Sequence, residues 1–486
     1  MLYSKLIEQH LANRECTFQD EKHSLSYSEL NKYAMAFSIV ITPLPPGGTV
    51  LICSINCIET CIAILGCIAL GYRYTVVHDK LTSENKKYVL LNSKASLVVG
   101  DDITWLENVE YDVDFFNIYD IWNLPVGTVD IQRTLVESAC DVYILYTSGS
   151  TKMPKGVLAG VSQVIFAVNA INSVLLNGKN DIIWNCLPLA FDYGMYQLFL
   201  ALDAQASFYI SPQPMISMIP KIIVQRKITA FPVVPSLLGM LLQSRLLSRT
   251  EGLKLRYISS TGDVLPVSWI RQIETLLPQT IVVPMYGITE CKRVAIMPLN
   301  DQHKKYQGSC GLPIPGIEVF IDKSYEKDNC GELIVYGPNV MKGYWNEEHN
   351  DSSVFGFDDE RNVYYLRTGD IFRQDEDGYL YFVERKSAFI KSNGYRISGR
   401  EIDAYILNKG IGIRESYTIG IPDQFLGQRI ITVVSGTYQE SDLKEIVLAL
   451  PQYMRPHVIK SLPYELPKTD NGKYDKRKIY EIAVMK

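Results

Sequence analysis

Asp141 to Val157 reads Asp-Val-Tyr-Ile-Leu-Tyr-Thr-Ser-Gly-Ser-Thr-Lys-Met-Pro-Lys-Gly-Val. Its first part, Val142 to Tyr146, is a short apolar run rich in β-branched and aromatic residues, which predicts a buried strand. Small hydroxylated residues and glycine follow, with Lys152 and Lys155 close behind. Such a loop lets backbone N–H groups, hydroxyls and ammonium groups approach a phosphate chain, because no bulky side chain blocks them. The stretch therefore predicts a phosphate-binding loop, with a plain surface turn after a strand as the alternative.

This loop lacks the P-loop spacing, which requires a glycine five residues before Gly-Lys-Ser/Thr. From Thr147 to Gly156 it instead resembles, residue for residue, the phosphate-binding signature of the AMP-forming adenylating enzymes. That superfamily contains acyl-CoA synthetases, nonribosomal peptide adenylation domains and luciferases. The resemblance implies that these residues grip the ATP phosphates: Thr147, Ser148, Gly149, Ser150, Thr151 and Lys155.

A second motif of the family lies in Val282 to Glu290, which resembles its Tyr-Gly-x-Thr-Glu signature. The resemblance implies that Tyr286 and Gly287 contact the adenine, that Thr289 touches the α-phosphate and that Glu290 ligates Mg²⁺. The residue types suit these tasks, because a flat ring stacks on a base and a hard oxygen anion binds a hard cation. Taken singly, Tyr286 and Glu290 would be ordinary core or surface residues.

Three more positions complete the predicted nucleotide site. Leu255 to Asp263 looks like a strand that ends in a small-residue turn, and the resemblance places Gly262 of this turn against the adenine. Asp370, at the end of Tyr-Tyr-Leu-Arg-Thr-Gly-Asp, matches an aspartate that accepts both ribose hydroxyls. A carboxylate suits that role because it offers two acceptor oxygens. Arg385 matches an arginine that also contacts the ribose.

The family also has one catalytic lysine near its C-terminus, and Leu466 to Lys473 (Leu-Pro-Lys-Thr-Asp-Asn-Gly-Lys) resembles its motif. An ammonium group at Lys473 would neutralise charge on the substrate carboxylate and the α-phosphate together. In isolation, a lysine after a glycine turn is usually a solvated surface residue. We expect the neighbouring Lys468, Lys476 and Lys478 to be of that kind.

Asp192 is the only charged residue in the apolar run Leu187 to Leu202. A carboxylate in such a setting is costly unless it is paired. One interpretation is a helix cap. The other is an anion that awaits a substrate cation, because Phe191-Asp192 resembles a pocket motif typical of family members that activate amino acids and hold the substrate amine. A charge-assisted hydrogen bond of roughly 1.5–3 kcal/mol would favour an amine-bearing substrate by tenfold or more.

Other positions that match the family's substrate pocket are mostly bulky. They predict a short cavity for a compact or flat acid and exclude a long acyl chain. Arg293 either meets a second polar group of the substrate or points away from it. The predicted lining consists of Tyr193, Tyr196, Val233, Ser259, Thr261, Met285, Arg293 and Val294.

The composition is that of an ordinary globular protein, with 47% hydrophobic and 21% charged residues in a chain of 486. A net charge of −5 gives no reason to expect nucleic acid or an anionic membrane as a partner. The apolar region Val50 to Leu70 is interrupted by Asn56 and Glu59, so it predicts a strand and a buried helix and not a membrane span. The ten cysteines form no CxxC pair, which favours reduced core residues, no zinc site and the cytoplasm.

Helical and strand-like patterns alternate along the chain, with helices expected at Tyr27 to Ile39 and Glu59 to Leu70. This alternation predicts an α/β fold with parallel sheets covered by helices. The resemblance implies a large N-terminal domain of parallel or mixed sheets, residues 1–386, and a small mobile α+β domain, residues 387–486, that carries the catalytic lysine. At the boundary the family has Gly-Arg-x-Asp/Lys, whereas this chain has Glu384 and Ser387 at the first and fourth positions. A hinge needs backbone freedom and not a particular charge, so we expect the rotation to differ only in rate or extent.

Together these features predict an enzyme that adenylates a small amine-bearing acid with ATP and Mg²⁺. The acid would be an amino acid such as proline, or an aminobenzoate. The acyl group would pass to the phosphopantetheine thiol of a separate carrier protein in nonribosomal peptide or natural-product biosynthesis, since the chain stops at Lys486. One alternative is an acyl- or aryl-CoA synthetase that uses free coenzyme A. Another is a non-catalytic nucleotide-binding relative, although Lys473 and Glu290 are both present.

Overall fold

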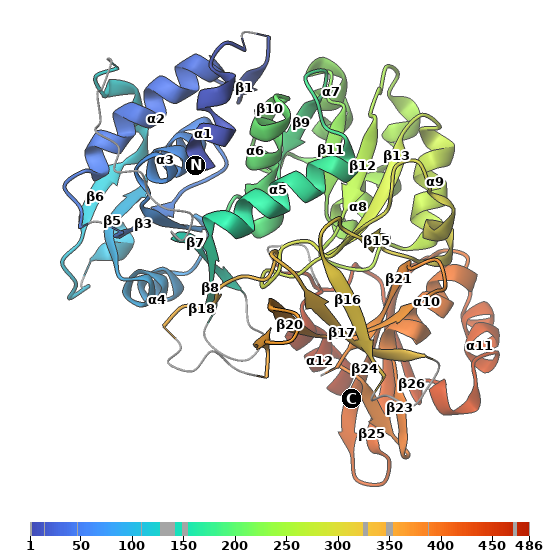
Figure 1. Cartoon of the computed structure of the whole chain (residues 1–486). Helices are drawn as coiled ribbons and strands as arrows, with labels where there is room; N and C mark the ends of the chain where they lie inside the picture. Colours follow the sequence, from blue (N-terminus) through green and yellow to red (C-terminus); the bar gives the residue numbers. More distant parts are fainter. Residues whose placement is uncertain are drawn as a thin grey trace.

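The computed structural model describes residues 2–13, 15–45, 47–107, 109–126, 141–147, 154–323, 329–346, 353–386, 388–469 and 474–485. These residues form four β-sheets with helices packed between and around them (Figure 1). The fold class expected from the sequence, mixed α/β sheets with a smaller α+β part at the C-terminal end, is confirmed. No helix within the described ranges is long and apolar enough to cross a bilayer.

The seven-stranded sheet contains the strand that precedes the predicted phosphate loop. Its strands are, in spatial order, β18 (Gly343–Tyr344), β8 (Lys155–Gly160), β7 (Asp141–Thr147), β4 (Arg73–Val77), β3 (Thr49–Cys53), β5 (Ala95–Gly100) and β6 (Asp114–Asn117). The predicted strand Val142 to Tyr146 is confirmed, since Val142 to Leu145 are buried in β7. β7 is parallel to β4 and antiparallel to β8, so β7 and β8 flank residues 148–153.

The nine-stranded sheet forms the second large layer. Its strands are, in spatial order, β15 (Leu312–Pro313), β14 (Ala295–Ile296), β13 (Ile281–Tyr286), β12 (Tyr257–Ser260), β11 (Ala230–Val233), β9 (Ile182–Asn185), β10 (Ser207–Ile210), β1 (Thr17–Gln19) and β2 (Ser24–Ser26). All neighbours from β1 to β13 are parallel. Their carboxyl ends therefore meet at one edge, which is where open α/β sheets bind ligands.

Helices α2 (Tyr27–Ile41), α3 (Ile58–Leu70), α5 (Val161–Leu175) and α6 (Asp192–Ala204) share one hydrophobic core with strands of both large sheets. The helix predicted at Tyr27 to Ile39 is confirmed, and a capping box between Ser26 and Glu29 fixes its start. Val50 to Leu70 is strand β3 followed by the buried helix α3, as predicted. The remaining helices of this part are α1 (Leu2–Leu6), α4 (Ser83–Ser93), α7 (Ile219–Gln225), α8 (Pro235–Ser244) and α9 (Val267–Leu276).

The two smaller sheets follow in the chain. The third sheet contains β16 (Glu318–Asp322), β17 (Cys330–Tyr336), β20 (Val363–Gln374), β19 (Phe355–Asp358) and β21 (Leu380–Arg385). The fourth contains β23 (Tyr395–Ile397), β22 (Ile390–Ser392), β25 (Gly427–Gly436), β24 (Ile413–Asp423) and β26 (Val458–Leu462). Helices α10 (Gly399–Lys409), α11 (Glu440–Leu448) and α12 (Lys476–Val484) lie beside this fourth sheet, in orange and red in Figure 1.

Short 3-10 helices lie in the connections between these elements. They are η1 (Glu8–His10), η2 (Thr104–Leu106), η3 (Ile118–Asn123), η4 (Ile216–Met218), η5 (Leu247–Arg249), η6 (His303–Gln307) and η7 (Gln452–Met454).

Candidate active site

The site begins at the carboxyl ends of β12 and β13, where two glycines shape the turns. Gly262 has a positive φ of 97°, a conformation that side chains disfavour. A Cβ atom on Gly287 would lie 2.0 Å from the carbonyl oxygen of Lys292, so only glycine lets the chain fold back so closely after β13. The returning segment leads into β14 and carries Thr289, Glu290 and Arg293.

Three residues predicted to bind the nucleoside come together beside this turn. The Tyr286 hydroxyl donates to Asp370 Oδ2 at 2.7 Å, and Arg385 Nε donates to Asp370 Oδ1 at 3.0 Å. Asp370 and Arg385 face each other across the antiparallel pair β20 and β21. Burial, together with the Asp370 carboxylate, raises the pKa of Tyr286 well above its usual value, so its hydroxyl stays protonated as a donor. Each Asp370 oxygen has two lone pairs, which leaves acceptor capacity for two ribose hydroxyls.

A second group joins Glu290 to the predicted phosphate loop. The Tyr344 hydroxyl donates to Glu290 Oε1 at 2.9 Å, and Lys155 Nζ lies 4.5 Å from the centroid of the Tyr344 ring. Thr147, at the end of β7, donates its hydroxyl to the Lys155 carbonyl oxygen at 3.3 Å. Thr289 is partly exposed in the same turn as Glu290. A metal-binding carboxylate is commonly oriented by such a hydrogen bond, so Glu290 fits a Mg²⁺ ligand and Lys155 fits a phosphate contact.

Sequence reasoning did not single out Tyr344. The available signal was its position after Lys342-Gly343, on the short strand β18, which pairs with β8 next to Lys155. An aromatic hydroxyl on the strand beside a phosphate loop is a candidate partner for a metal-binding carboxylate.

Several predicted residues lie outside the described residues. They are Ser148, Gly149, Ser150, Thr151, Ser387 and Lys473. Tyr474, the residue after Lys473, is among the described residues. Its pKa is raised well above the usual value by burial and by the carboxylates of Glu415, Asp263 and Asp403. The Asp263 carboxylate, one residue after Gly262, is therefore within electrostatic range of Tyr474.

The lysines around this C-terminal segment differ from each other. Lys478 is exposed, as expected. The expectation for Lys468 is wrong: its side chain is only 19% exposed and Nζ lies 2.8 Å from Oε1 of the buried Glu415. Lys468 therefore has a structural role, because it neutralises a buried carboxylate.

The predicted acid pocket is a narrow cavity between α5, α6 and the segment after β13, with only about 10 Å³ of space that a water-sized sphere can occupy. This is far below the usual range for ligand pockets, so the lining side chains must move apart before even a compact acid can enter. Four of the predicted lining residues, Tyr193, Tyr196, Met285 and Arg293, surround it. The other lining residues are Ile171, Leu175, Gln197, Leu200 and Lys292.

The structure reveals a partner of Asp192 that sequence reasoning missed. Lys292 Nζ donates to the Asp192 backbone oxygen at 2.7 Å and to Asp192 Oδ2 at 3.1 Å. The lysine is 1% exposed, and its Nζ lies 4.0 Å from the centroid of the Tyr196 ring. Burial lowers the pKa of Lys292 to about 7, against the opposing effect of Asp192.

Asp192 thus differs from the helix cap of one interpretation, and its role as an anion for a substrate cation stays a prediction. It is not a helix cap, because Phe191 occupies the N-cap position of α6 and Asp192 is the first helical residue. Its charge is also not unmatched before substrate binds, since Lys292 already pairs with it. The signal was a lysine beside Cys291 and Arg293 in an otherwise apolar segment.

Arg293 points inward, so the interpretation that it points away is wrong. It is 2% exposed, and Nη1 donates to Thr261 Oγ1 at 2.9 Å. Its guanidinium carbon lies 5.3 Å from the centroid of the Tyr193 ring. The Tyr193 hydroxyl is in turn 2.9 Å from Ser259 Oγ. Ser259 therefore helps to position Tyr193, and Thr261 helps to position Arg293.

Val233 and Val294 were also predicted to line the pocket, and the lining of the cavity described above does not include them. Val233 is buried with Trp184 and Phe231 in a hydrophobic cluster around β11. Val294 is buried with Leu333 in the cluster under the third sheet. Both side chains contribute to packing next to the cavity.

Asn339 is a further residue that the sequence did not single out. It is fully buried, and its Nδ2 donates to the backbone oxygens of Cys291 at 3.1 Å and Arg293 at 3.0 Å. These two bonds hold the backbone on both sides of Lys292. Asn339 therefore positions the two cations of the pocket.

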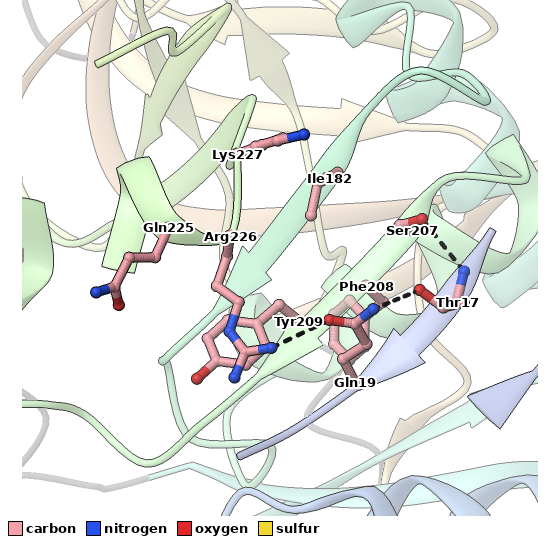
Figure 2. Close-up of a pocket in the computed structure, with 9 residues that line it drawn as sticks. All are labelled: Thr17, Gln19, Ile182, Ser207, Phe208, Tyr209, Gln225, Arg226 and Lys227. Carbon is pink, nitrogen blue, oxygen red and sulfur yellow. Dashed lines mark hydrogen bonds between the residues drawn. The ribbon is translucent and has the colours of Figure 1, made fainter. Parts of the chain in front are cut away.

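A larger hollow, with about 180 Å³ of space that a water-sized sphere can occupy, lies elsewhere, along β1, β9 and β10 (Figure 2). Arg226 lies over the ring of Tyr209 there, and its Nη1 is 3.4 Å from Gln19 Oε1. None of the predicted site residues lines this hollow. The candidate active site lies instead at the carboxyl edge of the nine-stranded sheet.

Comparison with known proteins agrees with this geometry. Residues 6–345 match the family described as AMP-binding enzyme. Bacitracin synthase 2 of Bacillus licheniformis is 26% identical over 480 residues, which are 96% of this chain and 18% of that protein. L-proline–(L-prolyl-carrier protein) ligase of Streptomyces coelicolor is 31% identical over 353 residues, 69% of this chain and 65% of that protein. The chain thus spans less than two thirds of the length of each of these relatives.

Among solved structures, the anthranilate CoA ligase AuaEII in complex with anthranoyl-AMP superposes with a TM-score of 0.88 at 19% identity. The alignment covers 99% of this chain and 97% of that one. This likeness supports the fold.

Proposed function

Because the chain belongs to the AMP-binding enzyme family, we propose that it activates a small carboxylic acid with ATP. The carboxylate of the acid attacks the α-phosphorus, pyrophosphate leaves, and an acyl-AMP forms. A thiol then attacks the acyl carbonyl, and AMP leaves with the electron pair of the broken C–O bond.

The observation that carries this proposal is the convergence of Asp370, Tyr286 and Arg385 beside Glu290 and Lys155. These residues come from segments that lie up to 230 positions apart, since 385 − 155 = 230. Hydrogen bonds join Tyr286 and Arg385 to Asp370. A hydrogen bond and a cation–π contact place Tyr344 between Glu290 and Lys155, and, against the opposing effect of burial, the carboxylates of Asp370 and Glu290 raise the pKa of Arg385. One nucleoside triphosphate needs a ribose acceptor, an aromatic base contact, a metal ligand and a phosphate contact in one place.

We propose residue roles that match the motifs of the family. Asp370 and Arg385 bind the ribose, Tyr286 contacts the adenine, and the two turn glycines Gly262 and Gly287 leave room for the base. Thr289 binds the α-phosphate. The remaining phosphate contacts come from Thr147, Ser148, Gly149, Ser150, Thr151 and Lys155.

Glu290 would hold Mg²⁺, which neutralises phosphate charge when bound. The Lys473 ammonium stabilises the negative charge that develops between the attacking carboxylate and the α-phosphate. It comes from a small domain, residues 387–486, that rotates against the large domain, residues 1–386, before the thiol attacks.

We propose an amine-bearing acid as the substrate, held by Asp192. A carboxylate accepts up to four hydrogen bonds, so the bond from Lys292 does not exhaust its capacity. The small cavity favours proline, another small amino acid or an aminobenzoate. The lining residues Tyr193, Tyr196 and Met285 limit the length of the acid.

We propose the phosphopantetheine thiol of a separate carrier protein as the acceptor, within natural-product biosynthesis in the cytoplasm. The relative named as a prolyl-carrier protein ligase supports this choice. The buried free thiols suit a reducing compartment. Free coenzyme A is the alternative acceptor.

The test is acid-dependent exchange of labelled pyrophosphate into ATP with a panel of amino acids, aminobenzoates and short fatty acids. We expect exchange with compact amine-bearing acids and little with fatty acids. Transfer of the activated acid to phosphopantetheinylated carrier proteins and to coenzyme A is then compared. Absence of exchange with every acid, despite ATP binding, would indicate a non-catalytic nucleotide-binding protein and refute the proposal.

A further inference from the structure

The substrate cavity contains a buried guanidinium without a carboxylate partner. Arg293 is 2% exposed, and among the described residues the only hydrogen bond of its guanidinium is to the neutral hydroxyl of Thr261. Its Nε has no hydrogen-bond partner there. An arginine stays charged in proteins, so this site has an unmatched positive charge.

The nearest acidic residue does not fill this gap. Asp192 influences Arg293 electrostatically but forms its ion pair with Lys292, at 3.1 Å. No acidic side chain of the described residues lies within ion-pair distance of Arg293. The cavity thus contains two cationic side chains, Lys292 and Arg293, next to one carboxylate.

We propose that the acid substrate carries a second carboxylate, which binds Arg293 inside this cavity. The inference rests on the proposed function and names the substrate class, a short dicarboxylic acid. Nη1 of Arg293 is used by Thr261, so the edge formed by Nε and Nη2 is available for a two-bond contact with a carboxylate.

The size of the cavity restricts the candidates. A water-sized sphere can occupy only about 10 Å³ inside it, so the lining side chains have to move apart for a carboxylate on a short chain or a single ring, and long diacids are excluded. The hydroxyl of Thr261 holds the guanidinium in place, and the Tyr193 ring covers one of its faces. Because the guanidinium is already fixed, binding a carboxylate costs little additional side-chain entropy.

The opposing interpretation is that Arg293 only fastens the segment after β13. In that case, replacing Arg293 would lower the free energy of unfolding and would reduce kcat/KM for all acids by the same factor. A second carboxylate on the substrate would then bring no advantage, because it would bury a further charge.

The test uses acids that differ by one group at a time: propionate, alanine, succinate and aspartate, with 3-aminobenzoate and 5-aminoisophthalate as an aromatic pair. In pyrophosphate exchange by the wild-type protein, each diacid should exceed its monoacid in kcat/KM by at least about 30-fold. The difference should be mainly in KM. Equal values within every pair, or better monoacids, would overturn the inference while leaving the proposed function intact.

Variants assign the preference to Arg293. Arg293→Gln should remove the diacid preference, and Arg293→Lys should restore part of it. Arg271→Gln changes an exposed arginine of α9 and should leave the diacid preference unchanged. A diacid preference that survives in Arg293→Gln would refute the role of Arg293. Absence of exchange with all acids in the wild-type protein would instead refute the proposed function.

Discussion

At the scale of single residues, Gly287 decides the shape of the pocket. An alanine Cβ there would meet the Lys292 carbonyl oxygen at 2.0 Å, so the segment bearing Lys292 and Arg293 must move. We expect Gly287→Ala to lower stability by about 2 kcal/mol or more and pyrophosphate exchange by at least about 100-fold. Urea unfolding and exchange assays measure the two effects. Gly178→Ala is the matched control, because nothing lies within 4 Å of its new Cβ and it should stay near wild type.

Asp192 links substrate choice to stability, because Lys292 depends on it. Asp192→Ala should abolish the preference for amine-bearing over amine-free acids, a loss of at least about tenfold in relative kcat/KM. It also leaves Lys292 buried without its carboxylate, which costs about 3–5 kcal/mol. The double variant Asp192→Ala with Lys292→Met should recover much of that stability but not the preference. Unchanged selectivity in both variants would contradict the role given to Asp192.

At the scale of elements, Asp403 ties α10 to β24. It accepts hydrogen bonds from the Ser416 hydroxyl at 2.7 Å, the Thr418 hydroxyl at 2.7 Å and the Thr418 amide at 3.0 Å. Burial nevertheless raises its pKa to about 6, although these bonds oppose the shift. The folded state therefore binds the proton more tightly than the unfolded state, so this stabilisation is complete below about pH 4 and is lost as the pH rises through 6.

Substituting Asp403 by asparagine removes that titration. We expect the unfolding free energy of the wild type, relative to Asp403→Asn, to fall by about 3 kcal/mol between pH 4 and pH 7. Denaturant unfolding of both proteins across this range gives the difference directly. A constant difference at every pH would show that Asp403 is ionised throughout.

At the scale of the whole molecule, one arginine connects the C-terminal part to the nucleotide side. Arg400, in α10, donates from Nη1 to Asp263 Oδ1 at 2.7 Å, and its Nε lies 3.4 Å from Glu384 Oε1. Glu384 also accepts a hydrogen bond from Ser398 at 3.2 Å, which explains why a carboxylate stands where the family has glycine. The proposed rotation of residues 387–486 must break the Arg400–Asp263 pair.

We therefore expect Asp263→Asn to change the rate of adenylation relative to the rate of transfer to the thiol. Pyrophosphate exchange should fall by only about threefold, because a partly exposed ion pair contributes little energy. Transfer to the thiol should not slow. Added salt should reduce exchange in the wild type more than in the variant. Equal slowing of both half-reactions would contradict a link between this pair and the rotation.

The clustering of Tyr286, Asp370 and Arg385 was predictable from the sequence, whereas the contacts in the proposed acid pocket were only partly so. Tyr286 and Arg385 end strands β13 and β21, Glu290 lies in the turn after β13 and Asp370 lies within β20, and all four belong to short sequence motifs. Lys292 contacts Asp192, which lies 100 positions earlier in the chain, and no local sequence pattern predicts such a contact.

The most direct test of the account is acid-dependent pyrophosphate exchange by Lys473→Ala beside Lys478→Ala, which changes an exposed neighbouring lysine. We predict that Lys473→Ala loses about 100- to 1000-fold in exchange while its Kd for ATP stays within about threefold, and that Lys478→Ala matches the wild type. Exchange at full speed in Lys473→Ala would contradict the account.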